Sequence, residues 1–251
     1  MNNTIAAIDI GTNAFHLVIA RIDDKKRFTV LTKAKEVVRL GTSSNDMKYI
    51  TDDSMKRGIE TLKRFNLICK SYNAEIIAIA TSATREALNK DIFLSKVLNE
   101  TGIEINIVSG YEEARLIYLG VLQSLSIYNK KILLIDIGGG STEFLIGEKG
   151  EVVSAISTKI GSVRLTNKFS LAEKIDKTNL KNARLFVKGA LNQVLRSIEN
   201  AEYEMVIGSS GTITNIGSII NSENEPSDDF EINLNGFVIK KKPLLNAVSS
   251  I

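Results

Sequence analysis

The order of apolar and polar positions along the chain occurs twice, 127 residues apart. AAIDIGTNAFHLVIARID lies in the first half and LLIDIGGGSTEFLIGEKG in the second. Each stretch is an apolar run that ends in Asp, a turn of small residues and a second apolar run, which predicts a β-hairpin. Superposing the copies matches Asp9 with Asp136, Gly11 with Gly138, His16 with Glu143 and Ile19 with Ile146. The repetition predicts two related halves.

The remaining pattern of the first half predicts a sheet with helices. We expect strands over Thr4–Ile10, Phe15–Ile22, Phe28–Ala34, 75–81 and 103–110. Helices are expected over Asp52–Tyr72 with Thr51 as N-cap, over 82–101 with Gly102 beyond its end, and over 111–125, where the helix closes the first half.

The second half repeats this order. Strands are expected from Lys131 onward and over Thr142–Ile146, Val152–Ile156 and 203–209, with helices over Lys177–Ile198 and directly after Gly208–Thr212. The C-terminal stretch NSENEPSDDFEINLNGFVIKKK predicts an acidic loop and a strand.

Three strands followed by alternating helices and strands, twice over, predict an α/β fold with two mixed sheets covered by helices. The strands are short and rich in Ile, Val and Ala, which favours buried sheets. The chain crosses between its halves near Tyr128–Lys130. We therefore expect one domain over residues 1–126 and a second over residues 127–251.

Composition narrows the classes of function. Of the 251 residues, 43% are hydrophobic and 24% are charged, as in a globular protein. The net charge of +3 gives no global field that would favour DNA. The N-terminus lacks a signal-peptide pattern, and no apolar segment approaches the ~18 residues that span a membrane. The lone Cys69 predicts core packing in a reducing compartment. We expect a cytoplasmic protein that binds neither DNA nor membranes.

The turn DIGGGST carries the strongest chemical signal. Consecutive glycines are costly unless the backbone must approach a neighbouring group closely, such as a phosphate. The candidate phosphate-binding residues of this turn are Gly138, Gly139, Gly140, Ser141 and Thr142. Asp136 and Glu143 flank the turn and offer two carboxylates for a divalent cation, since Mg²⁺ typically takes one or two carboxylates with phosphate oxygens and waters. A purely structural glycine turn is the alternative.

Two further small-residue loops are candidates for phosphate binding. The turn of the first copy offers Asp9, Gly11, Thr12 and Asn13, with Asp9 placed to hold a metal-bound water. Two such hairpins facing each other would form a phosphate clamp. The loop with Gly208, Ser209, Gly211 and Thr212 opens a predicted helix, whose free amides attract anions. An ordinary N-cap formed by Ser209 or Ser210 is the alternative.

Four charged residues complete the candidate chemistry. Glu112 and Glu113 stand at a predicted helix start, where they either complement the helix dipole or supply a general base that activates water. Arg85 follows a predicted strand, where it either clamps a phosphate or forms a salt bridge to a nearby glutamate, Glu86 or Glu75. The sole histidine, His16, lies in an apolar strand, which favours a packed or hydrogen-bonded residue over a catalytic one.

With these motifs in order, the chain resembles the exopolyphosphatase and guanosine pentaphosphatase (Ppx/GppA) family of the actin-like ATPase superfamily. The matching pieces span residues 5–216 and are AIDIGTNAFHLVIA, ATSATREA, VSGYEEARLIYLGV, LLIDIGGGSTEFLIG, KIGSVRLT and VIGSSGTITNI. The resemblance implies two ribonuclease-H-like domains with a cleft between them. It also implies Mg²⁺-dependent hydrolysis, with Mn²⁺ as a substitute, of the terminal phosphoanhydride of inorganic polyphosphate or guanosine pentaphosphate.

The resemblance also implies roles for individual residues. The second acid of its EEA motif is the general base, which corresponds to Glu113, while Glu112 stays an open alternative. The acids of DIGGGSTE hold the metal and correspond to Asp136 and Glu143. Asp9, Asn13 and Arg85 correspond to residues of the phosphate channel, as do the GGGST and GSSGT loops.

The chain departs from the family near its C-terminus. The RAD-type segment and the GLREG-like strand and helix that usually follow the GSSGT helix are absent. We expect either a truncated form or an unusually short member whose second domain lacks its closing elements. The apolar surface left uncovered favours oligomerisation, such as a homodimer, or partial instability. With one histidine, the chain carries no His-Asp phosphohydrolase module.

Two other functions stay open. An actin-like ATPase or sugar kinase would use the same clamp with an adenosine pocket, and a regulatory module would bind guanosine tetra- or pentaphosphate with little turnover. The residues do not separate polyphosphate from guanosine pentaphosphate, because both present the same terminal anhydride.

Overall fold

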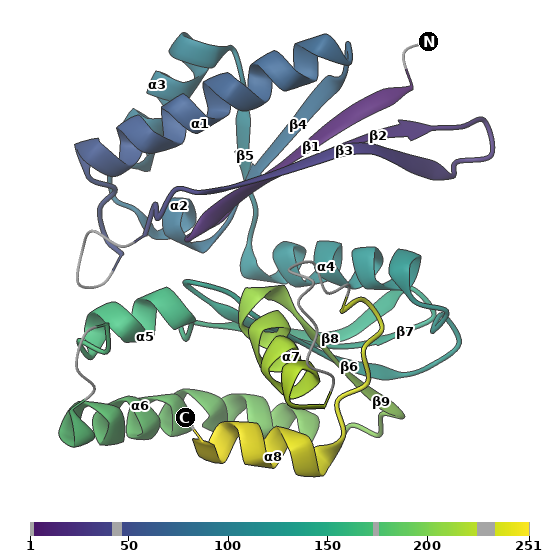
Figure 1. The fold of residues 1–251 in the computed structure, drawn as a ribbon, viewed down its shortest axis with the longest axis vertical. Coiled ribbons are helices and arrows are strands. Elements are labelled where there is room, and N and C mark those ends of the chain that lie inside the picture. Colours follow the sequence, from purple (N-terminus) through teal and green to yellow (C-terminus); the bar gives the residue numbers. More distant parts are fainter. Residues whose placement is uncertain (1–2, 42–46, 173–175, 225–233, 251) are drawn as a thin grey trace. The chain divides into compact units, whose positions relative to one another are not determined.

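The structure, a computed structural model, describes residues 3–41, 47–172, 176–224 and 234–250 (Figure 1). The chain forms two units that interleave along the sequence. The first comprises Met1–Gly110, Gly139–Ser141 and Lys159–Gly189, and the second comprises Tyr111–Gly138, Thr142–Thr158 and Ala190–Ile251. A single boundary between residues 126 and 127 stays a prediction.

The sheet of the first unit has five strands in the order β3-β2-β1-β4-β5. These are β1 (Thr4–Ile10), β2 (Ala14–Ile22), β3 (Phe28–Val37), β4 (Glu75–Ala80) and β5 (Ile105–Ile107). The three strands β1, β2 and β3 pair antiparallel, while β1, β4 and β5 pair parallel. Parallel neighbours need a crossover, which α1 (Asp52–Ser71) supplies before β4, and α2 (Ser82–Glu86) with α3 (Lys90–Thr101) supplies before β5.

Alternate residues of the first sheet form the core with α1 and α3. The buried side chains come from β1 and β2 on one side and from the helices on the other: Ala6, Ile8, Ile10, Phe15, Leu17, Ile19, Met55, Ile59, Leu62, Phe65 and Phe93. Helix α1 begins as predicted, because the Thr51 side chain accepts a hydrogen bond from the Ser54 amide. Figure 1 shows α1 and α3 side by side against this sheet.

The single helix predicted over residues 82–101 is wrong, because the structure has two helices there. Helix α2 ends at Glu86, Ala87 is extended, and α3 begins at Lys90. The Asn89 side chain accepts from the Ile50 amide at 3.0 Å and donates to the Ile50 carbonyl at 2.8 Å. This pairing satisfies backbone groups of the segment before α1, which favours the break over a continuous helix.

The sheet of the second unit has four strands in the order β8-β7-β6-β9. They are β6 (Ile132–Ile137), β7 (Thr142–Glu148), β8 (Glu151–Thr158) and β9 (Met205–Ser209). Strands β6, β7 and β8 pair antiparallel, and β9 pairs parallel with β6. This arrangement repeats the first sheet without its fifth strand, which confirms the predicted α/β fold with two mixed sheets.

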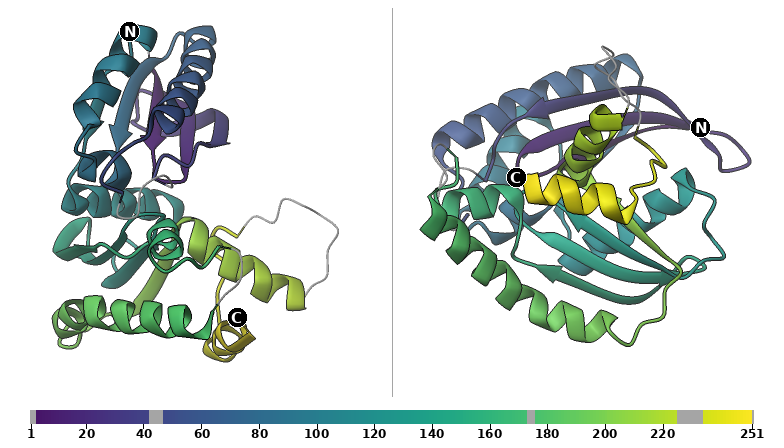
Figure 2. Two further views of the ribbon diagram at one scale, coloured as in Figure 1. Left: turned by 90° about the vertical axis from the view of Figure 1, so that its left-hand side faces the viewer. Right: turned by 60° about the horizontal axis from the view of Figure 1, so that its bottom comes forward.

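The helices after β8 agree with the prediction in part. Helix α6 (Lys177–Ile198) has its expected bounds, and α7 (Ser210–Asn224) follows β9 directly. Helix α5 (Ser162–Lys168) was not predicted. Residues 234–240 form no strand, and the chain continues as α8 (Lys241–Ser250), which contacts α7 (Figure 2). The predicted acidic loop falls largely on residues 225–233, outside the described residues.

Helix α4 (Gly110–Ser124) packs in the core of the second unit, against residues of its sheet. Ala114 and Tyr118 lie in one buried cluster with residues of β6 and β7. The fully buried Tyr118 ring occupies the space where a Cβ on Gly147 would stand, at 2.5 Å. Large-to-small complementarity between a helix and a strand therefore fixes α4 on this sheet.

The two hairpins pair in the same register, which confirms the superposition made from the sequence. Asp9 lies opposite His16 across β1 and β2, and Asp136 lies opposite Glu143 across β6 and β7. Residues directly opposite each other share one face of the sheet. The duplication therefore places equivalent side chains at equivalent positions.

Replacing Gly147 should destabilise the second unit. An alanine Cβ would lie 2.5–2.8 Å from three atoms of the Tyr118 ring. Overpacking of this kind costs about 2 kcal/mol, so we expect the free energy of unfolding of Gly147→Ala to fall by that amount in chemical denaturation. The matched control is Gly120→Ala in α4, where no atom lies within 4 Å. Removing this helical glycine should stabilise by about 0.5–1 kcal/mol. Equal stability of Gly147→Ala and wild type would contradict the packing argument.

Candidate active site

The turn of the first hairpin is held from behind through its carbonyl groups. The Thr12 carbonyl accepts a hydrogen bond from the Gly41 amide at 3.0 Å. The Asn13 carbonyl accepts from the amides of Val38 at 3.0 Å and Arg39 at 2.7 Å. Thr12 is buried, and its Oγ1 lies 2.9 Å from the Oγ of Ser82. The turn is thus fixed by the segment that follows β3.

The turn of the second hairpin contributes Gly139–Ser141 to the first unit, where Gly140 lies against Thr12 and Ser82. A Cβ on Gly140 would stand 2.5 Å from Ser82 Oγ and 2.8 Å from Thr12 Oγ1. A Cβ on Gly139 would stand 3.1 Å from Thr12 Cβ. The chain's own side chains therefore require glycine at Gly140, a reason that the sequence analysis did not include.

Arg164, in α5, binds this turn through two groups and Glu86 through a third. Its backbone amide donates to the Gly139 carbonyl at 3.0 Å, and its Nε donates to the Gly140 carbonyl at 2.7 Å. Its Nη2 donates to Glu86 Oε1 at 2.7 Å. The Arg164 side chain is 3% exposed. Sequence analysis missed this residue, although the KIGSVRLT motif that contains it was recognised.

Arg85 and Glu86 are neighbours with separate partners. Arg85 donates through Nη1 to the Val108 carbonyl at 2.9 Å, which ties α2 to the end of β5. Glu86 binds Arg164 through Oε1 and Lys159 through Oε2, the latter at 2.9 Å. The two carboxylate oxygens of Glu86 thus bind Lys159 and Arg164 rather than the adjacent Arg85.

Asp9 and His16 lie on the face of the first sheet that points away from α1. His16 Nδ1 is 3.6 Å from Asp9 Oδ2, and the two side chains are 45% and 49% exposed. The register places Lys35 beside His16 and Ile79 beside Asp9. His16 is thus a half-exposed partner of Asp9 rather than a packed core residue.

The equivalent row in the second sheet consists of oxygen-bearing side chains. The register aligns Ser157 of β8, Glu143 of β7, Asp136 of β6 and Ser209 of β9. Glu143 is 1% exposed and Asp136 is 7% exposed. Glu143 Oε1 accepts a hydrogen bond from Ser157 Oγ at 2.8 Å. Two adjacent buried carboxylates with flanking hydroxyls fit a hard, oxygen-preferring cation such as Mg²⁺ or Mn²⁺.

The two acids at the start of α4 differ in their surroundings. Arg115 binds both carboxylate oxygens of Glu112, through Nε and Nη2, each at 2.8 Å. These hydrogen bonds hold the pKa of Glu112 below its ordinary value. A carboxylate stabilised in this way is a poor proton acceptor. Glu112 is therefore a weak candidate for the general base, and Glu113 lies beside it on the same turn and is half-buried.

The GSSGT loop joins β9 to α7 through an unusual backbone conformation. The backbone of Ser210 has φ +74°, in the left-handed region that residues other than glycine rarely adopt. A Cβ on Gly208 would stand 2.6 Å from Ile213, so this glycine is required by packing. Gly211 has open space around it. Ser209 aligns with Asp136 in the sheet, and Thr212 is half-buried in the first turn of α7.

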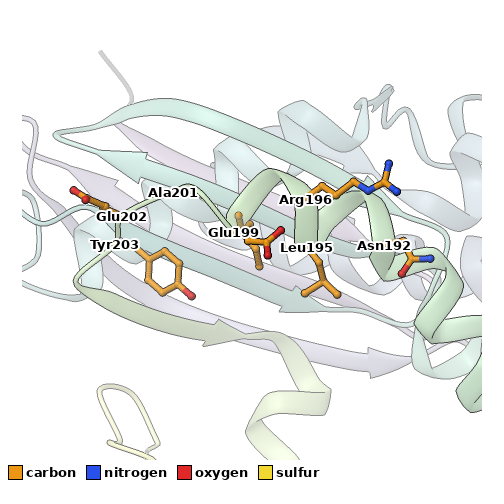
Figure 3. Close-up of a pocket in the computed structure, with 8 residues that line it drawn as sticks. Asn192, Leu195, Arg196, Glu199, Ala201, Glu202 and Tyr203 are labelled. Carbon is orange, nitrogen blue, oxygen red and sulfur yellow. The ribbon is translucent and has the colours of Figure 1, made fainter.

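A surface hollow of 880 Å³ lies in the second unit, and none of the residues predicted for the site lines it. It is formed by the C-terminal end of α6 and the segment before β9 (Figure 3). Its lining residues are Asn192, Leu195, Arg196, Ile198, Glu199, Ala201, Glu202 and Tyr203. None of these side chains is completely buried, and they form no convergent set of polar groups.

In the described part of the chain, no three or more side chains of His, Cys, Asp or Glu gather in a way that would hold a metal ion. There, too, no helix is both long enough and apolar enough to cross a membrane.

Comparison with known proteins gives one consistent group. The model of the Ppx/GppA phosphatase family matches residues 18–247. The chain is 37% identical over 246 residues to a bifunctional 3-dehydroquinate synthase/phosphatase of Fusobacterium nucleatum, with 94% of the chain and 37% of the relative covered. It is 34% identical to a guanosine-5'-triphosphate,3'-diphosphate pyrophosphatase of Photobacterium profundum, with 86% and 43% covered.

A solved structure extends this result to the fold. The crystal structure of an exopolyphosphatase from Cytophaga hutchinsonii superposes with a TM-score of 0.84 at 30% identity, covering 93% of this chain and 73% of that one. The similar structures share the actin-like ATPase fold. The chain spans about two-fifths of the length of the two curated relatives described above.

Adding a methyl group to Gly140 should destabilise the first unit. We expect Gly140→Ala to lower the free energy of unfolding by about 2 kcal/mol, because the turn has no free volume at this point. Adding Ser82→Ala removes the nearest atom, so the double variant should lose about 1 kcal/mol less than the sum of the single variants. Chemical denaturation measures all three. Gly211→Ala is the control and should change stability by less than about 0.5 kcal/mol. Strict additivity would refute the contact.

Proposed function

The chain belongs to the Ppx/GppA phosphatase family, and we propose that it hydrolyses the terminal phosphoanhydride bond of inorganic polyphosphate or of guanosine pentaphosphate. The observation that carries this proposal is the pair of buried carboxylates, Asp136 and Glu143, that the strand register places directly opposite each other on β6 and β7. Relatives named as an exopolyphosphatase and as a guanosine-5'-triphosphate,3'-diphosphate pyrophosphatase support the substrate class.

Residues of the first unit bind phosphate oxygens in this proposal. Thr12, Asn13 and the amides of Gly139–Ser141 are the donors, and Gly11 gives the turn its small size. Arg85 adds a guanidinium, which suits phosphate because it can form two parallel hydrogen bonds. Asp9 orients a water molecule beside these groups. The acid and amide groups lie on strands and turns that the core holds rigidly, which favours precise positioning.

Residues of the second unit hold the metal and the remaining phosphate contacts. Asp136 and Glu143 would bind Mg²⁺ or Mn²⁺ through their carboxylates, with Gly138, Thr142 and the loop of Gly208, Ser209, Gly211 and Thr212 as further phosphate donors. When bound, the divalent cation offsets the negative charge of the phosphate oxygens. The Ser157 hydroxyl fixes one oxygen of Glu143, which keeps that carboxylate in position.

Glu113 acts as the general base. It accepts a proton from a water molecule, and that water attacks the terminal phosphorus while the shortened phosphate chain departs with the bridging oxygen. Such transfers depend mainly on positioning and on electrostatic stabilisation. The cytoplasmic location and the homodimer stay predictions.

The test of the base compares two neighbouring residues. Glu113→Gln should lower kcat by 10²–10⁴-fold, the usual contribution of a general base. Glu112→Gln, the matched control, should stay within about fivefold, because Glu112 is occupied by Arg115. The measurement is phosphate release from polyphosphate and from guanosine pentaphosphate with Mg²⁺.

Other outcomes would replace the proposal. A larger loss in Glu112→Gln than in Glu113→Gln would transfer the base to Glu112. ATP hydrolysis without polyphosphate turnover would favour an actin-like ATPase. Tight guanosine pentaphosphate binding without phosphate release would favour a regulatory module.

The metal assignment is tested within one strand. Glu143→Gln should raise the Mg²⁺ concentration for half-maximal activity at least tenfold, because one anionic ligand is lost. Glu148→Gln, in the same strand and outside the aligned row, should change it less than twofold. Mg²⁺-dependent thermal stabilisation without substrate gives a second readout. Equal Mg²⁺ responses of the two variants would remove Glu143 from the metal site.

A further inference from the structure

In each hairpin turn, two successive carbonyl groups are bound from behind. In the first turn the carbonyls of Thr12 and Asn13 accept from backbone amides of residues 38–41. In the second turn the carbonyls of Gly139 and Gly140 accept from Arg164, one from its amide and one from its Nε. The superposition that matches Gly11 with Gly138 also matches these two pairs of carbonyls. The two turns thus share a pair of hydrogen-bonded carbonyl groups, and the donors to these carbonyls differ.

The donors come from equivalent parts of the two repeats. Residues 38–41 follow β3, the third strand of the first sheet, and the segment Gly161–Arg164 follows β8, the third strand of the second. The first turn needs only backbone amides. In the second, the arginine side chain supplies the donor to Gly140 that backbone supplies to Asn13 in the first.

The planar geometry of the peptide group determines which way the amides of the second turn point. In a planar trans peptide, the carbonyl of one residue and the amide of the next point to opposite sides. With the carbonyls of Gly139 and Gly140 directed at Arg164, the amides of Gly140 and Ser141 are directed away from it. Two successive amides on one side form a concave site for an anion.

We propose that Arg164 is a positioning residue that aims the amides of Gly140 and Ser141 at a phosphate group of the substrate. This inference rests on the proposed function, because it assumes that the glycine turn binds phosphate. Arg164 acts through the turn, since its side chain is 3% exposed and contacts the Gly140 carbonyl and Glu86. Glu86 accepts a hydrogen bond from Arg164 Nη2 and fixes the guanidinium in place.

Gly161 packs against the face of the peptide group between Gly139 and Gly140. A Cβ on Gly161 would stand 2.5 Å from the Gly139 oxygen, 2.6 Å from the Gly139 carbon and 2.6 Å from the Gly140 nitrogen. Nearly equal distances to three atoms of one peptide mean that Gly161 lies over the peptide plane. Any side chain there would rotate or displace the peptide, so Gly161 and Arg164 together set its orientation.

The experiment compares Arg164→Lys with Lys159→Met. Both residues bind Glu86, but only Arg164 also binds the turn. Lysine keeps the positive charge and loses the fork that reaches a carbonyl and a carboxylate together. We expect Arg164→Lys to raise KM for polyphosphate and Kd for imidodiphosphate, whose P–N–P bridge resists hydrolysis, about tenfold. The kcat should fall less than threefold, and the half-activating Mg²⁺ concentration should stay within twofold. Lys159→Met should change none of these more than twofold.

A second variant guards against a folding defect. Gly161→Ala changes no charge and should reproduce the rise in KM and Kd with little change in kcat. Circular dichroism and denaturation midpoints establish which variants are folded. Wild-type imidodiphosphate affinity in a folded Arg164→Lys or a folded Gly161→Ala would overturn the positioning role, as would a loss of kcat equal to the rise in KM.

The outcomes for the wild-type chain separate this inference from the proposed function. If it binds imidodiphosphate and releases no phosphate from polyphosphate, the proposed hydrolysis fails and the Arg164→Lys binding comparison still decides the positioning role. If it binds no imidodiphosphate with or without Mg²⁺, the positioning role fails as well.

Discussion

The peptide between Gly139 and Gly140 is closely packed against neighbouring residues, and much of the first unit converges on it. Thr12 and Ser82 close one side of Gly140, Gly161 lies over the peptide plane, and Arg164 binds the two carbonyls. Interiors are packed as densely as organic crystals, so a methyl group at such a point must displace a neighbour. The start of β2, the start of α2 and the segment after β8 are therefore fixed relative to one another by a turn that carries no side chain.

The same backbone plan carries different chemistry in its two copies. In the first sheet the aligned row is Lys35, His16, Asp9 and Ile79, which mixes positive, titratable, negative and apolar groups. In the second it is Ser157, Glu143, Asp136 and Ser209, which offers oxygen alone. The first row is half-exposed at Asp9 and His16, whereas the carboxylates of the second are buried. Mg²⁺ typically takes one or two carboxylates together with other oxygens, and this is the physical basis for proposing the cation in the second copy.

Elements with a strong local pattern could be predicted from the sequence. Elements whose bounds or position depend on residues far apart in the chain could not. The hairpin register and the bounds of α6 could be predicted, because period-two and helical spacing are read within one segment. The break before α3 could not, since it depends on the Asn89 side chain pairing with Ile50. Nor could the place of α4, which depends on Gly147 leaving room for Tyr118. In the site, the residue types around the glycine turns were readable, whereas Arg164 and Glu86, 78 positions apart, meet only in the folded chain.

The spacing of side chains on a helix explains why Arg115 binds Glu112, which the composition of the segment does not explain. Neighbouring residues on a helix point about 100° apart, and side chains three positions apart share a face. Arg115 stands three positions after Glu112 and two after Glu113, so one helical turn places its guanidinium on the first acid. Each of the two bonds to Arg115 stabilises the charged form of Glu112, which depresses its pKa and its basicity together. Arg115 thus makes Glu112 a weak base, which supports the proposal that its neighbour Glu113 activates the water.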